Sequence, residues 1–225
     1  MKKYLLLINL ISLIACFSAQ ADEKNQQEFL PYYNSAEFTP QWFKPNATEL
    51  KKLHKISDFK FINQQGEYVT QKDFDNGMYI ASFFFTSCPG ICPKMRSQLS
   101  KVRDKYRNKT HIKIISHSIQ PSNDTVEVLK NYANENDVNA DQWHLVTGNR
   151  DEIYAMARND YFANEDLGEY VSNEDFLHTE NLILIDHNKH IRGIYNGLNN
   201  TSVNHLIADI SKLEKELMSI HPKTK

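Results

Sequence analysis

Excess charge, repeated sequence and long apolar runs are all missing from this chain. Its 225 residues carry 26 Lys and Arg against 28 Asp and Glu, which gives a formal net charge of -2 at pH 7. Without a positive excess, the composition gives no reason to expect nucleic acid or an anionic membrane as a partner. No internal repeat or low-complexity stretch is visible, which excludes an architecture of stacked repeats.

The apolar runs are too short to cross a membrane. As a helix, the apolar residues 5–15 would span about 17 Å at 1.5 Å per residue, whereas the hydrocarbon core is roughly 30 Å thick. Lys2 and Lys3 precede this segment, as in the basic region of a secretory signal. We therefore expect residues 1–21 to be a signal peptide rather than a permanent membrane helix.

Two processing sites compete within this signal segment. Ala19-Gln20-Ala21 predicts cleavage before Asp22. Residues 13–16 resemble a bacterial lipobox, which would place a lipid on Cys16, and a retained anchor is the third alternative. All three predict an exported domain, either periplasmic or associated with the outer face of a membrane.

Cysteine is also scarce, with three in the whole chain. Because Cys16 belongs to the signal segment, the folded domain keeps only Cys88 and Cys92. A disulfide between them would close a very short loop and constrain the unfolded chain little, and about 200 residues can build a core without it. The two cysteines are therefore predicted to take part in redox or metal chemistry. The alternative is that they form a structural disulfide.

The surroundings of the pair suggest a strand that ends at a helix. Residues 78–85 form an apolar, aromatic run that is typical of a strand buried on both faces. Cys88-Pro89-Gly90 indicates a turn, and Pro93 suits the first position of a helix. The positive potential and unpaired N–H groups of a helix start would favour thiolates there.

The remaining pattern alternates strands with helices. Predicted strands cover residues 59–62, 67–70, 78–85, 111–118, 143–146, 182–186 and 191–195. Predicted helices cover residues 93–106, 125–134, 150–159 and 202–220. This order predicts a mixed α/β sheet covered by helices on both faces, with a hairpin near its N-terminal end.

Further predictions concern the caps, the loops and the domain limits. Asp124 and Asn149 are predicted as helix N-caps. Residues 22–53 are polar and punctuated by proline, so we expect an extended arm or tether before a domain at residues 54–221. The acidic residues 163–175 are expected to form a surface loop.

The thiol pair suits two kinds of chemistry. Cysteines at positions i and i+4 around a helix start can point to one side. Two thiolates there suit Cu(I) most naturally, or Cu(II) or Zn(II), and they can also oxidise to a disulfide. A mononuclear site with two protein thiolates usually recruits a third donor.

Nine histidines are available as that donor, and most have a structural interpretation. His117 and His144 lie at strand ends, where packing or capping is expected. His187 and His190 lie in a turn and are expected to be solvated. His178 precedes the strand 182–186, in a connection that faces the thiol loop in a thioredoxin-like arrangement, so it is a candidate ligand.

Proline is missing from that connection. Thioredoxin-type oxidoreductases place a cis-proline there, but this chain has no proline between Pro121 and Pro222. The position where it would lie is near His178. A potential metal donor thus stands in place of the apparatus that binds substrate disulfides.

With these features the chain resembles the Sco/SenC family of thioredoxin-fold copper proteins, over roughly residues 56–217. The resemblance rests on the order and spacing of several short segments. They are residues 84–93 around the thiol pair, 124–129 before a helix, 145–148 after a strand, His178-Thr179 and the hairpin 184–189.

The resemblance implies a thioredoxin-like α/β fold and a copper site. In that family two cysteines and a histidine bind one copper ion, as Cu(I) or Cu(II), which here would be Cys88, Cys92 and His178. Members help to assemble the copper centre of cytochrome c oxidase, either as metallochaperones or by reducing the cysteines of the receiving subunit. The implied partners are that subunit and, in addition, a thiol reductase or another copper chaperone.

The sequence departs from the family pattern at two positions near this site. Leu177 replaces the acidic residue that usually precedes the histidine, and Gln120-Pro121 replaces a frequent Asp-Pro.

The alternative function is a thiol-disulfide oxidoreductase, or a thiol peroxidase, that acts through Cys88 and Cys92. It would require an activated thiol and turnover on a disulfide or a peroxide.

Overall fold

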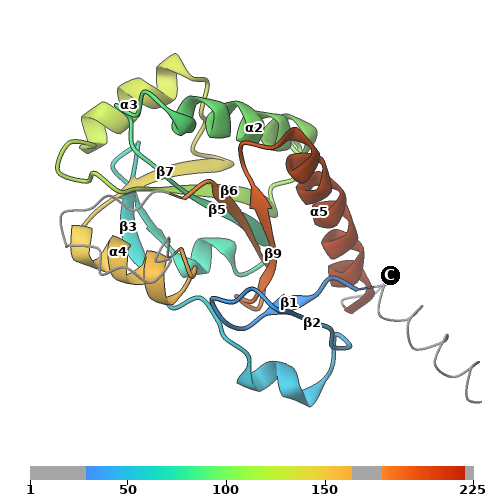
Figure 1. Cartoon of the computed structure of the whole chain (residues 1–225). Helices are drawn as coiled ribbons and strands as arrows, with labels where there is room; N and C mark the ends of the chain where they lie inside the picture. Colours follow the sequence, from blue (N-terminus) through green and yellow to red (C-terminus); the bar gives the residue numbers. More distant parts are fainter. Residues whose placement is uncertain (1–28, 164–178, 221–225) are drawn as a thin grey trace, which may run out of the picture.

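The structure is a computed structural model of the chain, and it describes residues 29–163 and 179–220. Its centre is a nine-stranded sheet in the order β2-β1-β9-β8-β5-β6-β7-β3-β4. Helices α2, α3 and α5 pack on one face of this sheet and α4 packs on the other (Figure 1). The predicted mixed sheet with helices on both faces is confirmed.

The element bounds lie close to those predicted. The strands are β1 Tyr32–Tyr33, β2 Pro40–Gln41, β3 Lys60–Asn63, β4 Tyr68–Thr70, β5 Met78–Phe84, β6 Ile112–Ser118, β7 Trp143–Thr147, β8 Asn181–Ile185 and β9 Ile191–Asn196. The helices are α2 Ile91–Lys105, α3 Val126–Glu135, α4 Arg150–Asn159 and α5 Asn200–Ile220, with short 3₁₀ helices η1 Thr48–Lys52 and η2 Gln71–Phe74. Strands β5, β6 and β7 are parallel, and β8 runs antiparallel to β5.

Strand β5 explains the apolar run in the sequence. All seven of its residues are buried, because helices cover both faces of the sheet. Ile80 and Phe84 join the core beneath α2, α3 and α5, whereas Tyr79 and Phe83 join the core beneath α4. Continuous apolarity is therefore needed at this strand, as in other strands covered on both sides.

Two predictions at helix starts are wrong. Helix α2 begins at Ile91, two residues before Pro93. A proline is tolerated throughout the first turn, because the N–H groups there have no acceptor within the helix and no helical hydrogen bond is lost. Helix α3 is capped by Thr125, whose side chain accepts a hydrogen bond from the Val128 N–H, and not by Asp124. The Asp124 side chain is fully buried instead.

The cap predicted for α4 is confirmed, because the Asn149 side chain accepts a hydrogen bond from the Glu152 N–H.

Among the described residues, no helix has the length and apolarity needed to span a bilayer. Residues 164–178, which hold nearly all of the predicted acidic loop, lie outside the described residues, as does the signal segment with Cys16.

The described part of the arm is built into the sheet. Tyr33 of β1 pairs with Ile191 of β9, and Leu30 and Leu50 are buried. Figure 1 shows this segment beside β9 and the C-terminal end of α5. The arm is anchored at the side of the sheet formed by β8 and β9, away from β3 and β4.

His190 corrects a further prediction, because it is buried rather than solvated, with 3% of its surface exposed. Its ring lies 3.5 Å from the Asp186 carboxylate and 3.2 Å from the Leu50 carbonyl oxygen. The ring also packs edge-on against Tyr32. This histidine helps to hold the arm, which explains why a turn position is closed to solvent.

His117 and His144 are packed, as predicted. His117 is fully buried on β6, between the aromatic rings of Phe59, Phe61, Phe83 and Tyr161. Neither ring nitrogen has a hydrogen-bond partner among the described residues. Burial lowers the pKa of His117 to about 3, so the ring behaves as a neutral aromatic side chain.

This burial predicts acid sensitivity. Below its usual pKa of 6.5 the unfolded chain binds a proton at His117 that the folded chain cannot bind. Folding should therefore lose about 2 kcal/mol between pH 7 and pH 5 from this residue alone. Urea unfolding at both pH values measures the effect, and His117→Phe should remove this part of the loss. An equal loss in the variant would contradict the assignment.

Candidate thiol and metal site

Cys88 and Cys92 lie in the thiol loop, which we define as residues 85–92 between β5 and the first turn of α2. The Cys88 N–H donates to the Phe85 carbonyl oxygen at 3.3 Å, so the tight turn comes just before Cys88 rather than after it. Cys88 is half-buried, Cys92 is 6% exposed, and both are free thiols. Both pack against the core beneath α2.

The two thiols have opposite electrostatic surroundings. Burial opposes ionisation of Cys88, but hydrogen bonds from the Cys92 thiol and from backbone N–H groups at the start of α2 outweigh it and lower the pKa of Cys88. Burial raises the pKa of Cys92 to about 12, and its hydrogen bond to Cys88 acts in the same direction. The pair therefore favours one thiolate, at Cys88, that accepts a hydrogen bond from Cys92.

The exposed side of the loop leaves room for another group. Pro89 and Gly90 are exposed, and apart from Gly90 and its chain neighbours no atom of the described residues lies within 4 Å of the position where a Cβ on Gly90 would be. Nearby, the Arg96 guanidinium donates to the Tyr132 hydroxyl at 3.0 Å. Tyr132 in turn packs against Phe84, so it forms one wall beside the cysteines.

The connection from β6 to α3 is hydrogen-bonded to the thiol loop. Thr86 donates to Asp124 through its hydroxyl, at 2.5 Å, and through its backbone N–H, at 3.2 Å. Ser87 donates to the Gln120 side chain at 3.5 Å. Sequence reasoning assigned Asp124 to a cap and missed this contact, since only the fold brings residues 38 positions apart together.

The third predicted site residue, His178, lies outside the described residues. In the part of the chain that the structure covers, no group of three His, Cys, Asp or Glu side chains could hold a metal ion. Thr179 is described and buried, and its hydroxyl accepts a hydrogen bond from the Asn181 N–H. Because β8 is antiparallel to β5, Asn181 begins β8 at the end of the sheet where the thiol loop leaves β5.

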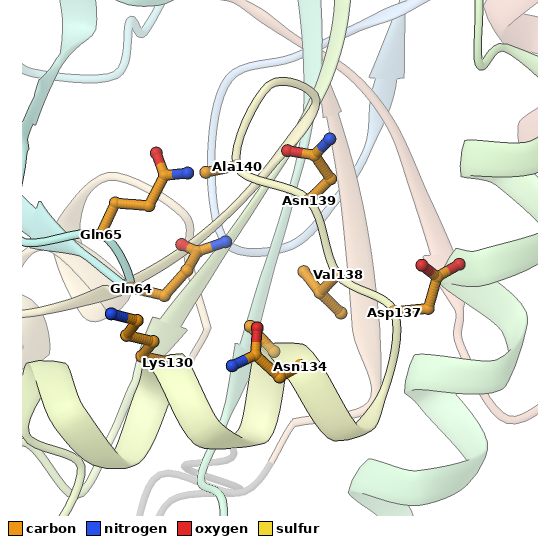
Figure 2. A pocket seen from close by; sticks show the side chains of 9 residues that line it. Gln64, Gln65, Lys130, Asn134, Asp137, Val138, Asn139 and Ala140 are labelled. Atoms are coloured by element: carbon orange, nitrogen blue, oxygen red, sulfur yellow. The ribbon is translucent and has the colours of Figure 1, made fainter.

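Figure 2 shows a cavity of about 360 Å³ that does not involve the thiol loop. It lies between α3 and the start of β7, and Gln64, one of its lining residues, bonds to Trp143 and Leu145. Because β7 is parallel to β5 in the sheet, this cavity is at the opposite end from the cysteines. Six of its nine lining residues are polar; the nine are Gln64, Gln65, Lys130, Ala133, Asn134, Asp137, Val138, Asn139 and Ala140.

Comparison with known families agrees with this geometry. The family profile described as SCO1/SenC matches residues 47–215, which include the thiol loop and the whole central sheet except β1 and β2. The chain belongs to the SCO1/SenC family. The resemblance inferred from the motifs is thereby confirmed, together with the thioredoxin-like fold.

Individual members of the SCO1/SenC family are similar over most of the chain. A SCO1 protein homolog of Bacillus subtilis is 28% identical over 162 residues, which is 70% of this chain and 81% of the relative. The structure of BsSco aligns with a TM-score of 0.60 at 27% identity, covering 72% of this chain and 94% of BsSco. BsSco is described as having a disulfide switch and as a member of the Sco family of cytochrome c oxidase assembly proteins.

A copper-bound relative is also similar. The structure of Arabidopsis thaliana ScoI with copper bound aligns with a TM-score of 0.55 at 26% identity, covering 71% of this chain and 98% of ScoI. The fold described above is thus shared with a Sco protein that holds copper. SCO1/SenC proteins act in the copper assembly of cytochrome c oxidase, which defines the coarse function of the family.

Proposed function

We propose that this protein is an exported copper metallochaperone for the copper centre of cytochrome c oxidase. One copper ion, as Cu(I) or Cu(II), is held by the thiolates of Cys88 and Cys92 and by the imidazole of His178. The observation that carries the proposal is the free, hydrogen-bonded thiol pair at the start of α2, in a fold similar to a copper-bound Sco protein.

The donor set fits copper. Thiolates are soft ligands that select Cu(I), and imidazole suits both oxidation states. The lowered pKa of Cys88 makes its thiol easier to ionise than that of Cys92, so Cys88 is the sulfur better prepared to bind a cation. Cys92 keeps its proton until a cation replaces it, so we expect binding to release protons and to weaken as pH falls.

Redox state controls the same two sulfurs. Reduced Cys88 and Cys92 can bind metal, whereas a disulfide between them uses both sulfurs and leaves no thiolate ligand. Oxidation to that disulfide releases two electrons and two protons, which a partner disulfide takes up when it is reduced to two thiols. The partners under this proposal are the copper-receiving oxidase subunit and a thiol reductase or a second copper chaperone.

His178 is assigned on its place in the chain. It immediately precedes Thr179, and the described residues from Thr179 into β8 lie at the end of the sheet where β5 meets the thiol loop. An imidazole from this connection would supply the third donor that two cysteines lack. Among the described histidines, His117 and His144 are ruled out as alternatives because they are buried in the α4-side core and against Phe74.

A copper titration of the reduced protein tests the proposal. We expect saturation at one equivalent, with a Cu(II)–thiolate charge-transfer band. Cys88→Ser or Cys92→Ser should abolish the band. His178→Ala should shift the band and weaken binding by at least the roughly 10- to 100-fold that is lost when a residue that only orients a metal ligand is removed. His187→Ala is the matched control, since His187 lies in the β8–β9 turn, and it should change nothing.

The second candidate is a thiol-disulfide oxidoreductase, which the lowered pKa of the half-buried Cys88 favours. Insulin reduction and peroxide consumption by the copper-free protein measure this activity. Turnover that depends on Cys88, together with no copper retained by the reduced protein against a chelator, would replace the metallochaperone proposal.

Export is part of the same proposal. The N-terminal segment directs the domain to a periplasm or to the outer face of a membrane, by cleavage before Asp22 or by lipidation of Cys16. Intact-mass measurement of the protein from a membrane fraction and from a soluble extracytoplasmic fraction distinguishes the two. An unprocessed chain found in the cytoplasm would contradict export.

A further inference from the structure

Asp124 is a buried carboxylate that the metal site does not use as a ligand. Its side chain has no exposed surface, and its partners are hydroxyl and backbone N–H donors. The Thr86 and Ser118 hydroxyls each donate to it at 2.5 Å, and the Thr86 N–H donates at 3.2 Å. A buried carboxylate is costly unless such donors compensate it, so the fold depends on these three hydrogen bonds to keep Asp124 buried.

Helix capping does not account for this residue. Thr125 already caps α3 through its bond from the Val128 N–H. The Asp124 carboxylate instead joins Thr86, just after β5, to Ser118, the last residue of β6. Asp124 therefore fastens the start of the thiol loop to the neighbouring parallel strand.

The contact reaches both cysteines through a single residue, Phe85. The Thr86 N–H and the Phe85 carbonyl belong to one planar peptide unit, and that carbonyl accepts the Cys88 N–H at 3.3 Å. The Phe85 N–H, on the other side of the same residue, donates to the Cys92 sulfur. Fixing the Thr86 N–H therefore orients the Phe85 carbonyl that holds Cys88. It also restrains the backbone of Phe85, whose N–H meets Cys92.

We propose that Asp124 is a positioning residue that holds Thr86 and Phe85 so that the two sulfurs are preorganised for a metal ion. This inference deepens the proposed copper function, because preorganised ligands bind more tightly than ligands that must be ordered on binding. It adds a role for a residue that touches neither the metal nor a substrate. The copper readout below rests on the proposed function, whereas the exchange readout does not.

The test compares Asp124→Asn and Thr86→Val with Thr86→Ser. In Asp124→Asn an amide nitrogen replaces an acceptor, and in Thr86→Val a methyl replaces the donating hydroxyl, whereas Thr86→Ser keeps it. Amide hydrogen exchange of the reduced, metal-free protein should be about tenfold faster within residues 86–92 in the first two variants. Copper affinity should fall roughly 10- to 100-fold in the same two variants, whereas Thr86→Ser should keep both the exchange rate and the copper affinity of the wild-type protein.

Ser82→Ala is the matched control, since it removes a different buried hydroxyl, bonded to Ser116 at 2.8 Å within the sheet. It should lower overall stability without faster exchange in residues 86–92. The inference is overturned if Thr86→Val leaves loop exchange unchanged, or if exchange rises equally throughout β5. Should the wild-type protein bind no copper, the proposed function fails, but loop exchange still decides the role of Asp124.

Discussion

Arg192→Met is expected to lower the free energy of unfolding by about 3–5 kcal/mol, the usual cost of removing one partner from a buried ion pair. Arg192 is 3% exposed and bonds to Asp186 at 3.2 Å and to Glu216 at 2.8 Å. It also donates to the carbonyl oxygens of Leu30 and Pro31. Its loss would leave two buried carboxylates without their cation, and it would release the arm.

Equilibrium urea unfolding measures this effect, and limited proteolysis reports the arm. The matched control is Arg107→Met, because Arg107 pairs with Asp104 at 2.7 Å on the surface, with 64% of its side chain exposed. That variant should change stability by less than about 1 kcal/mol. If both variants lost the same free energy, the buried network would have no special importance for the arm.

Cys88 should be alkylated much faster than Cys92 when the reduced, folded protein meets a limiting amount of iodoacetamide at neutral pH. The thiolate is the reacting species, the pKa of Cys88 is lowered, and that of Cys92 is about 12. Allowing for the greater nucleophilicity of a more basic thiolate, we expect a ratio of roughly 30 or more. Mass spectrometry of the labelled peptides measures it.

The denatured chain is the control, since both cysteines should react alike when burial and hydrogen bonding are removed. Equal labelling in the folded state would contradict the assignment of the thiolate to Cys88. Faster labelling of Cys92 would reverse it. The result also bears on function, because the faster thiol is the one that meets an incoming ion or a partner disulfide first.

Most elements of the fold could be predicted from the sequence because their patterns are local. The apolar run of β5, the helix α5 and the cap at Asn149 each appear where expected. One error arose because two neighbouring residues could both serve as the cap of α3. Asp124 and Thr125 both suit an N-cap, and local pattern cannot tell which side chain the fold requires elsewhere.

The candidate site was only partly accessible in the same way. Cys88 and Cys92 were found from their spacing, because both lie within one short loop. The support by Asp124 and the burial of His190 were missed, since each depends on contacts between distant parts of the chain. His178 remains a prediction, as it lies outside the described residues.

The sequence by itself determined the order of strands and helices, the thiol pair and the family, because periodicity and motif spacing are properties of neighbouring residues. Only the tertiary structure decided which thiol is ionised, what holds the thiol loop, and how the arm is fastened. These depend on burial and on hydrogen bonds across the sheet, where the cost of an unpaired charge is set by the surrounding fold rather than by adjacent residues. A carboxylate such as Asp124 acquires its role only when β5 and β6 lie side by side.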